Sequence, residues 1–168
     1  MPELTSREKL QPSLLDRLTD DEPDRKIESR DKRVLTGLQL RESVRRDLTW
    51  LLNHTRLQTM QDLAAYPEVA RSTLNYGIPD LAGKTASTVD VRALEDALRA
   101  SILTFESRLL PDTIRLRSVV GSKECSHNAL VFVIEAELWA QPVPLRIFLK
   151  TDLDLETGEI SISETAAE

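Results

Sequence analysis

The stretch "FESRLLPDTIRLRS" (residues 105–118) contains the point at which the hydrophobic period of the chain changes. Before it, apolar residues recur at helical spacing from residue 91 to Phe105, after Asp90, a residue type favoured at helix N-termini. After Pro111, apolar and polar residues alternate through residue 120, which is typical of a half-buried strand. We therefore expect a long helix to end here and a sheet to begin.

Strand patterns continue to the end of the chain. Residues 130–138 and 145–150 alternate in the same way, and "LETGEI" (residues 155–160) predicts a hairpin turn. The fold class that follows is α+β, with N-terminal helices packed on a C-terminal three- to four-stranded antiparallel sheet. On its polar face we expect Glu135 and Glu137 to meet arginines 115, 117 or 146 across strands as a solvated surface.

A second long helix is predicted after "TGLQ" (residues 36–39), where Thr36 and Gln39 have the spacing of a capping box. Its buried stripe would be Leu40, Val44, Leu48 and Leu51, and it would end near Asn53. On its exposed side we expect Glu42 to pair with Arg46 at i,i+4.

The connection between the two helices, from residue 61 to residue 83, is rich in turns. Pro67 is suited to open a helical turn, Gly77 can adopt positive φ, and Pro79 favours an extended conformation at Ile78. Tyr76 belongs either to a rigid connector or to a knob that contacts a partner, and the pattern supports both interpretations.

Residues 1–33 carry nine acids and eight bases interrupted by three prolines, so we expect a flexible charged arm. Within the arm, Leu10, Leu14, Leu15 and Leu18 recur at helical spacing and predict a short amphipathic helix. Its leucines could dock on the body or on a partner. The expected organisation is this arm, a single α+β domain at 34–163, and a tail at 164–168.

Composition excludes several function classes. The 168-residue chain has 22 basic and 28 acidic residues and a net charge of -6, which disfavours nucleic acid or anionic membranes as main partners. It has no run of about 18 apolar residues, and its N-terminus lacks the apolar stretch of a secretory signal. We therefore expect a cytoplasmic protein whose partners are other proteins.

Cofactor and metal sites are not expected. The five glycines form no phosphate-binding loop. His54, Cys125 and His127 are too few for a structural zinc site. Cys125 and His127 could form a nucleophile and base pair, but i,i+2 spacing in a polar loop is a poor geometry for it.

Glu106 is the best candidate for chemistry. It follows the end of the predicted helix, where the helix dipole disfavours an anion, so it needs a cationic partner or a proton. A protonated Glu106 could serve, with Asp112, as the acid of a glycoside hydrolase. Two observations argue against this role. The chain has only two Trp, two Tyr and three Phe, so it offers few aromatic rings on which a sugar could stack, and Arg108 would keep Glu106 ionised. As a structural latch, Glu106 and Arg108 would each seek a partner elsewhere, because i and i+2 do not face each other on a helix.

Four segments together resemble the TssE family of type VI secretion baseplate subunits. They are "LLDRLTDDEP" (residues 14–23), "LRESVRRDLTWLLN" (residues 40–53), "YPEVARSTLNYGIPDL" (residues 66–81) and "FESRL" (residues 105–109). The family is related to the contractile-phage baseplate wedge proteins once labelled lysozyme-like. The resemblance extends from about residue 12 to the last strands.

The resemblance implies a structural, non-enzymatic subunit in a baseplate at the cytoplasmic face of the inner membrane. Its partners would be the wedge subunits TssF, TssG and TssK and the sheath subunits TssB and TssC, whose assembly it helps to start. Leu14, Leu15, Leu18 and Tyr76 are candidate partner contacts.

The family signature Glu-Pro-Arg maps onto Glu106 and Arg108 as a charged pair, with Ser107 in place of the proline. A free sheet edge could accept a strand from the sheath. The chain also departs from the family at His54, which is inserted in "LLNHTR" (residues 51–56).

Overall fold

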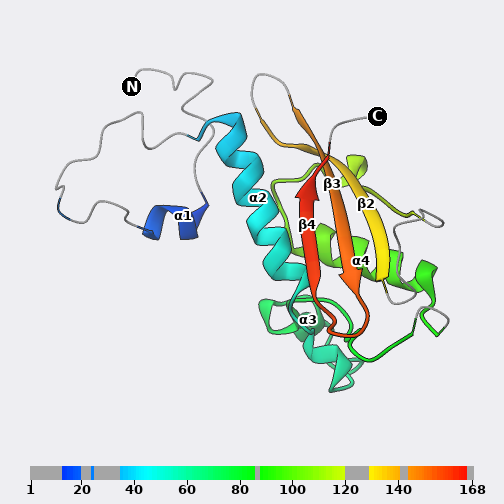
Figure 1. Ribbon diagram of the computed structural model, residues 1–168. Helices are drawn as coiled ribbons and strands as arrows, with labels where there is room; N and C mark the ends of the chain where they lie inside the picture. Colours follow the sequence, from blue (N-terminus) through cyan, green and yellow to red (C-terminus); the bar gives the residue numbers. More distant parts are fainter. Residues whose placement is uncertain are drawn as a thin grey trace.

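The computed structural model describes residues 13–19, 24, 35–85, 88–119, 129–140 and 144–165. Its helices are α1 (Leu14–Leu18), α2 (Gly37–Leu52), α3 (Pro67–Ala70) and α4 (Val91–Phe105), with 3-10 turns η3 (Leu57–Thr59), η4 (Thr73–Asn75) and η5 (Pro111–Thr113). Its strands are β1 (Arg115–Ser118), β2 (Ala129–Leu138), β3 (Leu145–Asp154) and β4 (Ile160–Glu164). Figure 1 shows α2 running beside the sheet next to β4.

The four strands form an antiparallel sheet in the order β1-β2-β3-β4. Alternate residues of each strand face the helices, so that Ile134 opposes Leu149 and Ala136 opposes Ile147 in one continuous apolar core. This confirms the α+β fold with helices packed on an antiparallel sheet. The opposite face mixes charged side chains with Val131, Val133 and Phe148, and it carries the expected ion pairs Arg117–Glu135 and Arg146–Glu137.

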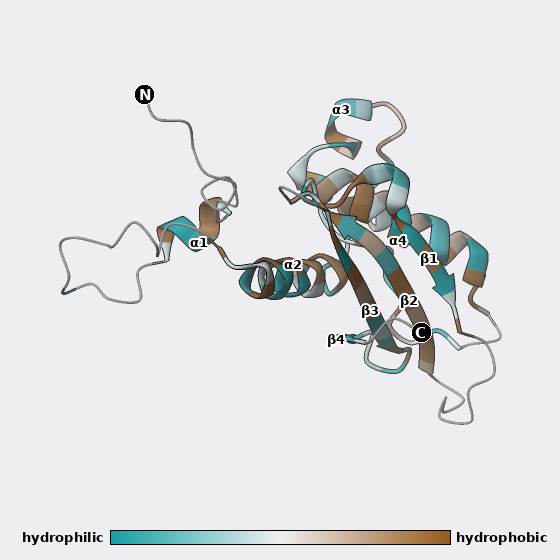
Figure 2. Cartoon of the chain, turned by 90° about the horizontal axis from the view of Figure 1, so that it is seen from above, coloured by the Kyte–Doolittle hydropathy of each residue, from teal (hydrophilic) through white to brown (hydrophobic). Residues whose placement is uncertain are grey.

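Helix α2 begins and ends as its sequence predicts. The Thr36 hydroxyl accepts from the Gln39 N–H at 3.2 Å, and the Gln39 side chain accepts from the Thr36 N–H at 2.9 Å. The helix ends at Leu52 with Asn53 as its C-cap, and its predicted stripe of three leucines and one valine is buried. Figure 2 shows polar and apolar residues side by side along this amphipathic helix.

One prediction for α2 was wrong. Glu42 pairs with Arg45 at i,i+3, whereas Arg46 binds Asp47 and the carboxylate of Asp16. The physical reason is that α1 lies against α2 and brings the carboxylate of Asp16 to Arg46. The sequence of α2 by itself does not contain this contact.

Helix α4 also follows its local signals. Asp90 accepts hydrogen bonds from the backbone N–H groups of Arg92 and Ala93 at 3.0 and 3.1 Å. Three residues of the predicted stripe are buried in the core, and the two at its ends, Val91 and Phe105, are half-buried. The helix ends at Phe105, as the change of period predicts.

The connector between the helices is held against both of them. Pro67 opens α3, and Gly77 has a φ of 118°. The Ser101 hydroxyl of α4 donates to the Gly77 C=O at 2.6 Å, and Ile78 is extended and bridges in parallel to Thr55. These contacts fix the segment that carries Tyr76. Cys125, His127 and Leu10, which the sequence singled out, lie outside the described residues.

Candidate functional site

Glu106 and Arg108 contact each other directly at the corner between α4 and the sheet. Arg108 donates from Nε to Oε1 of Glu106 at 2.7 Å and from Nη2 to Oε2 at 2.5 Å. Its backbone N–H donates to the same Oε1 at 3.0 Å. The carboxylate is therefore held by a two-pronged guanidinium contact, the strongest geometry available to an ion pair of side chains.

The expectation that each residue finds a partner elsewhere in the fold was wrong for Glu106, which binds Arg108 itself. It was confirmed for Arg108, which also binds Asp47 and Ser43 of α2. The expectation assumed that both residues lie on the helix, but Glu106 is the C-cap of α4, with φ -108° and ψ 84°. A turn follows, in which the Leu109 N–H donates to the Glu106 C=O at 3.3 Å. Because the backbone reverses here, side chains two positions apart come together.

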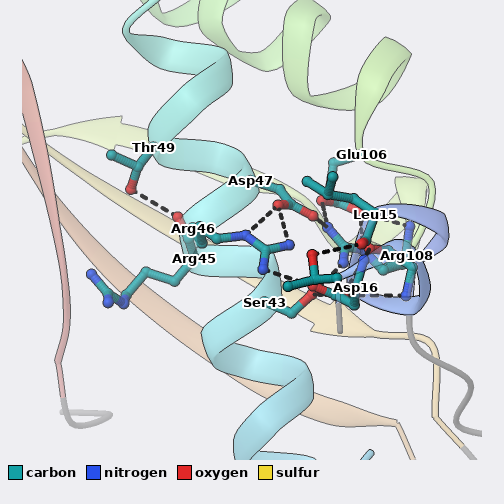
Figure 3. Close-up of polar contacts among 11 residues, drawn as sticks. Leu15, Asp16, Ser43, Arg45, Arg46, Asp47, Thr49, Glu106 and Arg108 are labelled. Atoms are coloured by element: carbon teal, nitrogen blue, oxygen red, sulfur yellow. Dashed lines mark hydrogen bonds and ion pairs between the residues drawn. The ribbon is translucent and has the colours of Figure 1, made fainter. Parts of the chain in front are cut away.

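Helix α2 completes the site with Asp47 and Ser43. Arg108 donates from Nη2 to Oδ2 of Asp47 at 2.6 Å and from Nη1 to Oγ of Ser43 at 2.8 Å. We call Glu106, Arg108, Asp47 and Ser43 the latch, since they join the end of α4 to the middle of α2 (Figure 3). Only 6% of Glu106 is exposed, so the carboxylate and its guanidinium partner are largely removed from water.

The surroundings of Arg108 favour the charged form of its guanidinium. Burial by itself would lower the pKa of Arg108, but hydrogen bonds and charge from Glu106, followed by those from Asp47, raise it well above its usual value. Breaking one member of such a buried pair leaves the other charge without compensation. The latch therefore fixes the end of α4 to the middle of α2.

A second ion-pair group extends the latch to α1. Arg46 donates from Nη1 to Oδ1 of Asp16 at 2.7 Å and from Nη2 to Oδ1 of Asp47 at 2.8 Å. The Ser43 hydroxyl, which accepts from Arg108, donates to Oδ2 of Asp16 at 3.1 Å. Figure 3 shows this series of contacts running from α1 across α2 to the corner. The pKa of Asp16 is lowered: burial opposes the change, and hydrogen bonds from Ser13, Arg46 and Ser43 outweigh it.

The structure places α1 on the body through its polar side. Its N-cap Ser13 forms a capping box with Asp16, and Asp16 makes the contacts to α2. The three leucines are exposed instead, with Leu14 at 71% and Leu18 at 73%. Thus the helix is docked in cis by a carboxylate while its apolar side chains stay available.

A cavity of about 510 Å³ lies beside the latch, between α1, α2 and the end of α4. Its apolar walls include Leu14, Leu15, Trp50 and Tyr76, and its polar wall is the latch itself. The Tyr76 ring packs edge-on against Phe105 at 5.2 Å and against His54 at 5.6 Å. Burial, followed by the negative charges of Asp47 and Glu106, raises the pKa of Tyr76. The structure therefore brings five sequence-predicted residues to one corner, namely Glu106, Arg108, Leu14, Leu15 and Tyr76.

The geometry of this corner does not suit general acid catalysis by Glu106. A general acid must carry a proton and reach its substrate, whereas both oxygens of Glu106 bind Arg108. Asp112 lies in η5 and is exposed. No group of three or more His, Cys, Asp or Glu side chains able to hold a metal ion occurs among the described residues.

Sequence reasoning missed Asp16, Ser43 and Asp47 as members of the site. Ser43 and Asp47 are one helical turn apart, beside the apolar stripe of α2, a spacing that marks a polar row next to a buried face. That signal was available. The sequence did not show which side chain this polar row would contact, because its partner, Arg108, lies far away in the chain.

Comparison with known proteins matches the chain to a protein family. The family model described as "Baseplate wedge protein gp25" matches residues 38–143, which include α2, α4, the latch and β2. Searches of curated proteins and of solved structures found no match. Within the described part of the chain, no helix has the length and apolar character needed to cross a membrane.

Proposed function

Because the chain belongs to the baseplate wedge protein gp25 family, we propose that it is a structural subunit of a contractile baseplate, and specifically the TssE subunit of a type VI secretion system. It acts by binding other baseplate proteins and has no catalytic role. The resemblance of "LLDRLTDDEP" and "YPEVARSTLNYGIPDL" to TssE supports the finer assignment.

In this proposal, residues 34–163 form the wedge domain and residues 1–33 and 164–168 flank it. The wedge partners are TssF, TssG and TssK, and the first ring of the sheath, made of TssB and TssC, assembles on the sheet. The baseplate lies in the cytoplasm against the inner membrane. The candidate contacts are the exposed leucines of α1, with Leu14 and Leu18 mostly in solvent, and Tyr76 at the cavity.

The observation that carries the proposal is the closed latch. Arg108 satisfies Glu106 and also binds Asp47 and Ser43, so the charged groups of the corner hold α4 against α2. A corner fixed in this way presents α1, Trp50 and Tyr76 in a defined arrangement to a partner. This is the behaviour of an assembly subunit.

The experiment is co-purification of the tagged subunit with the other wedge subunits and the sheath. Glu106→Ala and Arg108→Ala are expected to lower the recovery of wedge subunits, because each leaves a buried charge without its partner. Asp112→Ala is the matched control, since it removes an exposed acid at the same corner. Full recovery of the wedge with both latch variants would contradict the proposal.

The alternative, a lysozyme-like glycoside hydrolase that uses Glu106, makes a different prediction. Purified protein incubated with peptidoglycan should release soluble sugars, and Glu106→Gln should abolish that release while the fold remains intact. We expect no release above background from either protein. Activity lost specifically in Glu106→Gln would replace the structural assignment with an enzymatic one.

A further inference from the structure

Between α2 and α4 the chain forms a small lobe of three short turns, η3, α3 and η4, which we define as residues 56–75. One buried amide holds the turns together. Asn75, which is 7% exposed, accepts from the Gln58 N–H and donates from Nδ2 to the Ala70 C=O, both at 2.9 Å. Its side chain therefore joins η4 to η3 and to α3. Figure 2 shows α3 projecting beyond the long helices and the sheet.

The lobe exposes three large apolar side chains. Met60 is 85% exposed, Leu74 is 68% exposed and Tyr66 is 59% exposed. The bond between Gln58 and Asn75 sets the turn that leads to Met60 against the turn that carries Leu74. Single exposed apolar residues are normal, but neighbouring ones on a rigid support mark a contact surface, and tyrosine and methionine are enriched in protein interfaces. The lobe is therefore a candidate protein contact.

Arg56, the first residue of the lobe, is a cation without a carboxylate. Its side chain makes no hydrogen bond or ion pair with a described residue, although the chain has a net charge of -6. By contrast, Arg45, Arg46 and Arg108 each bind a carboxylate. Nε of Arg56 is buried without a partner, whereas its Nη groups are not buried. The side chain is thus packed as far as Nε, and a tip held in this way is preorganised to receive a carboxylate.

We propose that the lobe is a second contact surface of the subunit and that it binds an acidic segment of a partner protein. A carboxylate of this segment binds the Nη groups of Arg56, and its apolar side chains contact Met60, Tyr66 and Leu74. None of these four residues lines the cavity beside the latch. Charge complementarity selects the occupant, because Arg56 is fixed by packing and lacks an anion among the described residues. The inference rests on the proposed function only for the source of the segment, a wedge subunit.

The first test measures the free subunit and needs no partner. Arg56→Met keeps an unbranched side chain that can pack in the same place, and it removes a buried donor that has no acceptor. The urea midpoint of this variant is expected to equal or exceed that of the wild type. A lower midpoint would show that the guanidinium serves the fold of the free subunit, and it would overturn the proposal.

The second test measures the Kd between the purified subunit and the purified wedge subunits by biolayer interferometry. Arg56→Met is expected to raise the Kd by about tenfold or more, because it leaves a carboxylate of the partner without its cation. Arg92→Met is the matched control, since Arg92 is an exposed arginine in the first turn of α4. An unchanged Kd for Arg56→Met, or an equal change in both variants, would refute the assignment of Arg56.

The salt dependence of the Kd tests whether the contact is an ion pair. Raising the NaCl concentration from about 0.1 M to about 0.5 M screens exposed charges, so the Kd of the wild type is expected to rise. The Kd of Arg56→Met is expected to rise less, because one ion pair is already absent. The same salt dependence in both proteins would contradict a carboxylate at Arg56.

The double variant Met60→Ser and Leu74→Ser tests the apolar part of the surface. Both side chains are mostly exposed, so the fold should remain, and the Kd for the wedge subunits is expected to rise by about tenfold. Leu38→Ser is the control, since Leu38 is 76% exposed at the start of α2. If the double variant instead abolishes a self-association of the free subunit seen by sedimentation, the occupant is a second copy and the acidic partner is wrong.

Failure of this inference can be distinguished from failure of the proposed function. If the wild type and Arg56→Met bind the wedge subunits equally well, the proposed function stands and the lobe inference is overturned. If the wild type binds no wedge subunit, the proposed function is contradicted. The urea midpoint of Arg56→Met, which involves no partner, then decides whether Arg56 is a group that the free subunit leaves unused.

Discussion

The guanidinium of Arg108 spans the end of one helix and the middle of another, with Nη2 at 2.5 Å from Oε2 of Glu106 and 2.6 Å from Oδ2 of Asp47. One cation thus neutralises carboxylates that come from α4 and α2. Like charges this close repel strongly in a partly buried site. Because Arg46 also binds Asp47, Glu106 is the carboxylate whose charge depends on Arg108. The position of the corner therefore depends on this single side chain.

Glu106→Gln tests the energetic weight of that contact. The amide keeps the shape of the side chain but removes its charge, and it presents an N–H₂ group to a guanidinium that has only donors. We expect the free energy of unfolding to fall by about 2–3 kcal/mol in urea titrations. Asp112→Asn, the same change at an exposed acid, should alter it by less than about 0.5 kcal/mol. Equal stability of the two variants would show that the latch contributes little to folding.

Ser107→Pro tests whether the serine loosens the corner. Residues 106–109 form a turn closed by the Leu109 N–H and the Glu106 C=O, and position 107 is where proline is favoured in such turns. Glu106 is already outside the helical region, as a residue before proline should be. We expect the free energy of unfolding, measured by thermal unfolding, to rise by about 0.4–1 kcal/mol, because proline leaves the unfolded chain fewer conformations to lose on folding. A loss of stability would mean that the backbone at 107 does not suit proline.

Docking of α1 should depend on acid pH. The pKa of Asp16 in the folded protein lies below its ordinary value of 3.8, so the ionised group stabilises the docked state above 3.8, and this contribution is lost as the pH falls through the lowered pKa. Trp50 lines the same cavity as Leu14 and Leu15, so its fluorescence should report release of α1.

Asp16→Asn provides the comparison for this titration. It lacks the charge that Arg46 binds, so its fluorescence should already resemble the acid form at neutral pH and should not show the acid transition. An identical transition in both proteins would assign it to another group.

Gly77 and Gly83 form a matched pair for backbone strain. Both have positive φ, 118° and 73°, but a Cβ at position 77 would lie 2.1 Å from the carbonyl oxygen of His54, whereas one at position 83 would meet no atom within 4 Å. Gly77→Ala is expected to lower the free energy of unfolding by about 3 kcal/mol or more, and Gly83→Ala by about 1 kcal/mol. Similar losses would show that the clash at position 77 is relieved by a backbone shift.

Most of the fold could be predicted from the chain because its signals are local. The capping box of Thr36, the N-cap of Asp90 and the alternation in β2 and β3 each depend on residues within a few positions of one another. The pairing of Glu42 could not be predicted, because Arg46 is drawn to Asp16, 30 residues away. The direct contact of Glu106 with Arg108 was missed because it depends on the residue at which α4 ends. The two side chains meet only because the helix ends at Phe105, before Glu106.

The sequence by itself determined that an amphipathic helix ends near Phe105, that strands follow, and that an acid and an arginine stand at the junction, since periodicity and capping are properties of short segments. Only the tertiary structure decided what those two charges bind. Asp47 and Ser43 reach Arg108 because α2 and α4 pack on the same sheet, and Asn53 reaches β4 for the same reason. Contacts between distant segments depend on how complete elements pack, and no local pattern records that.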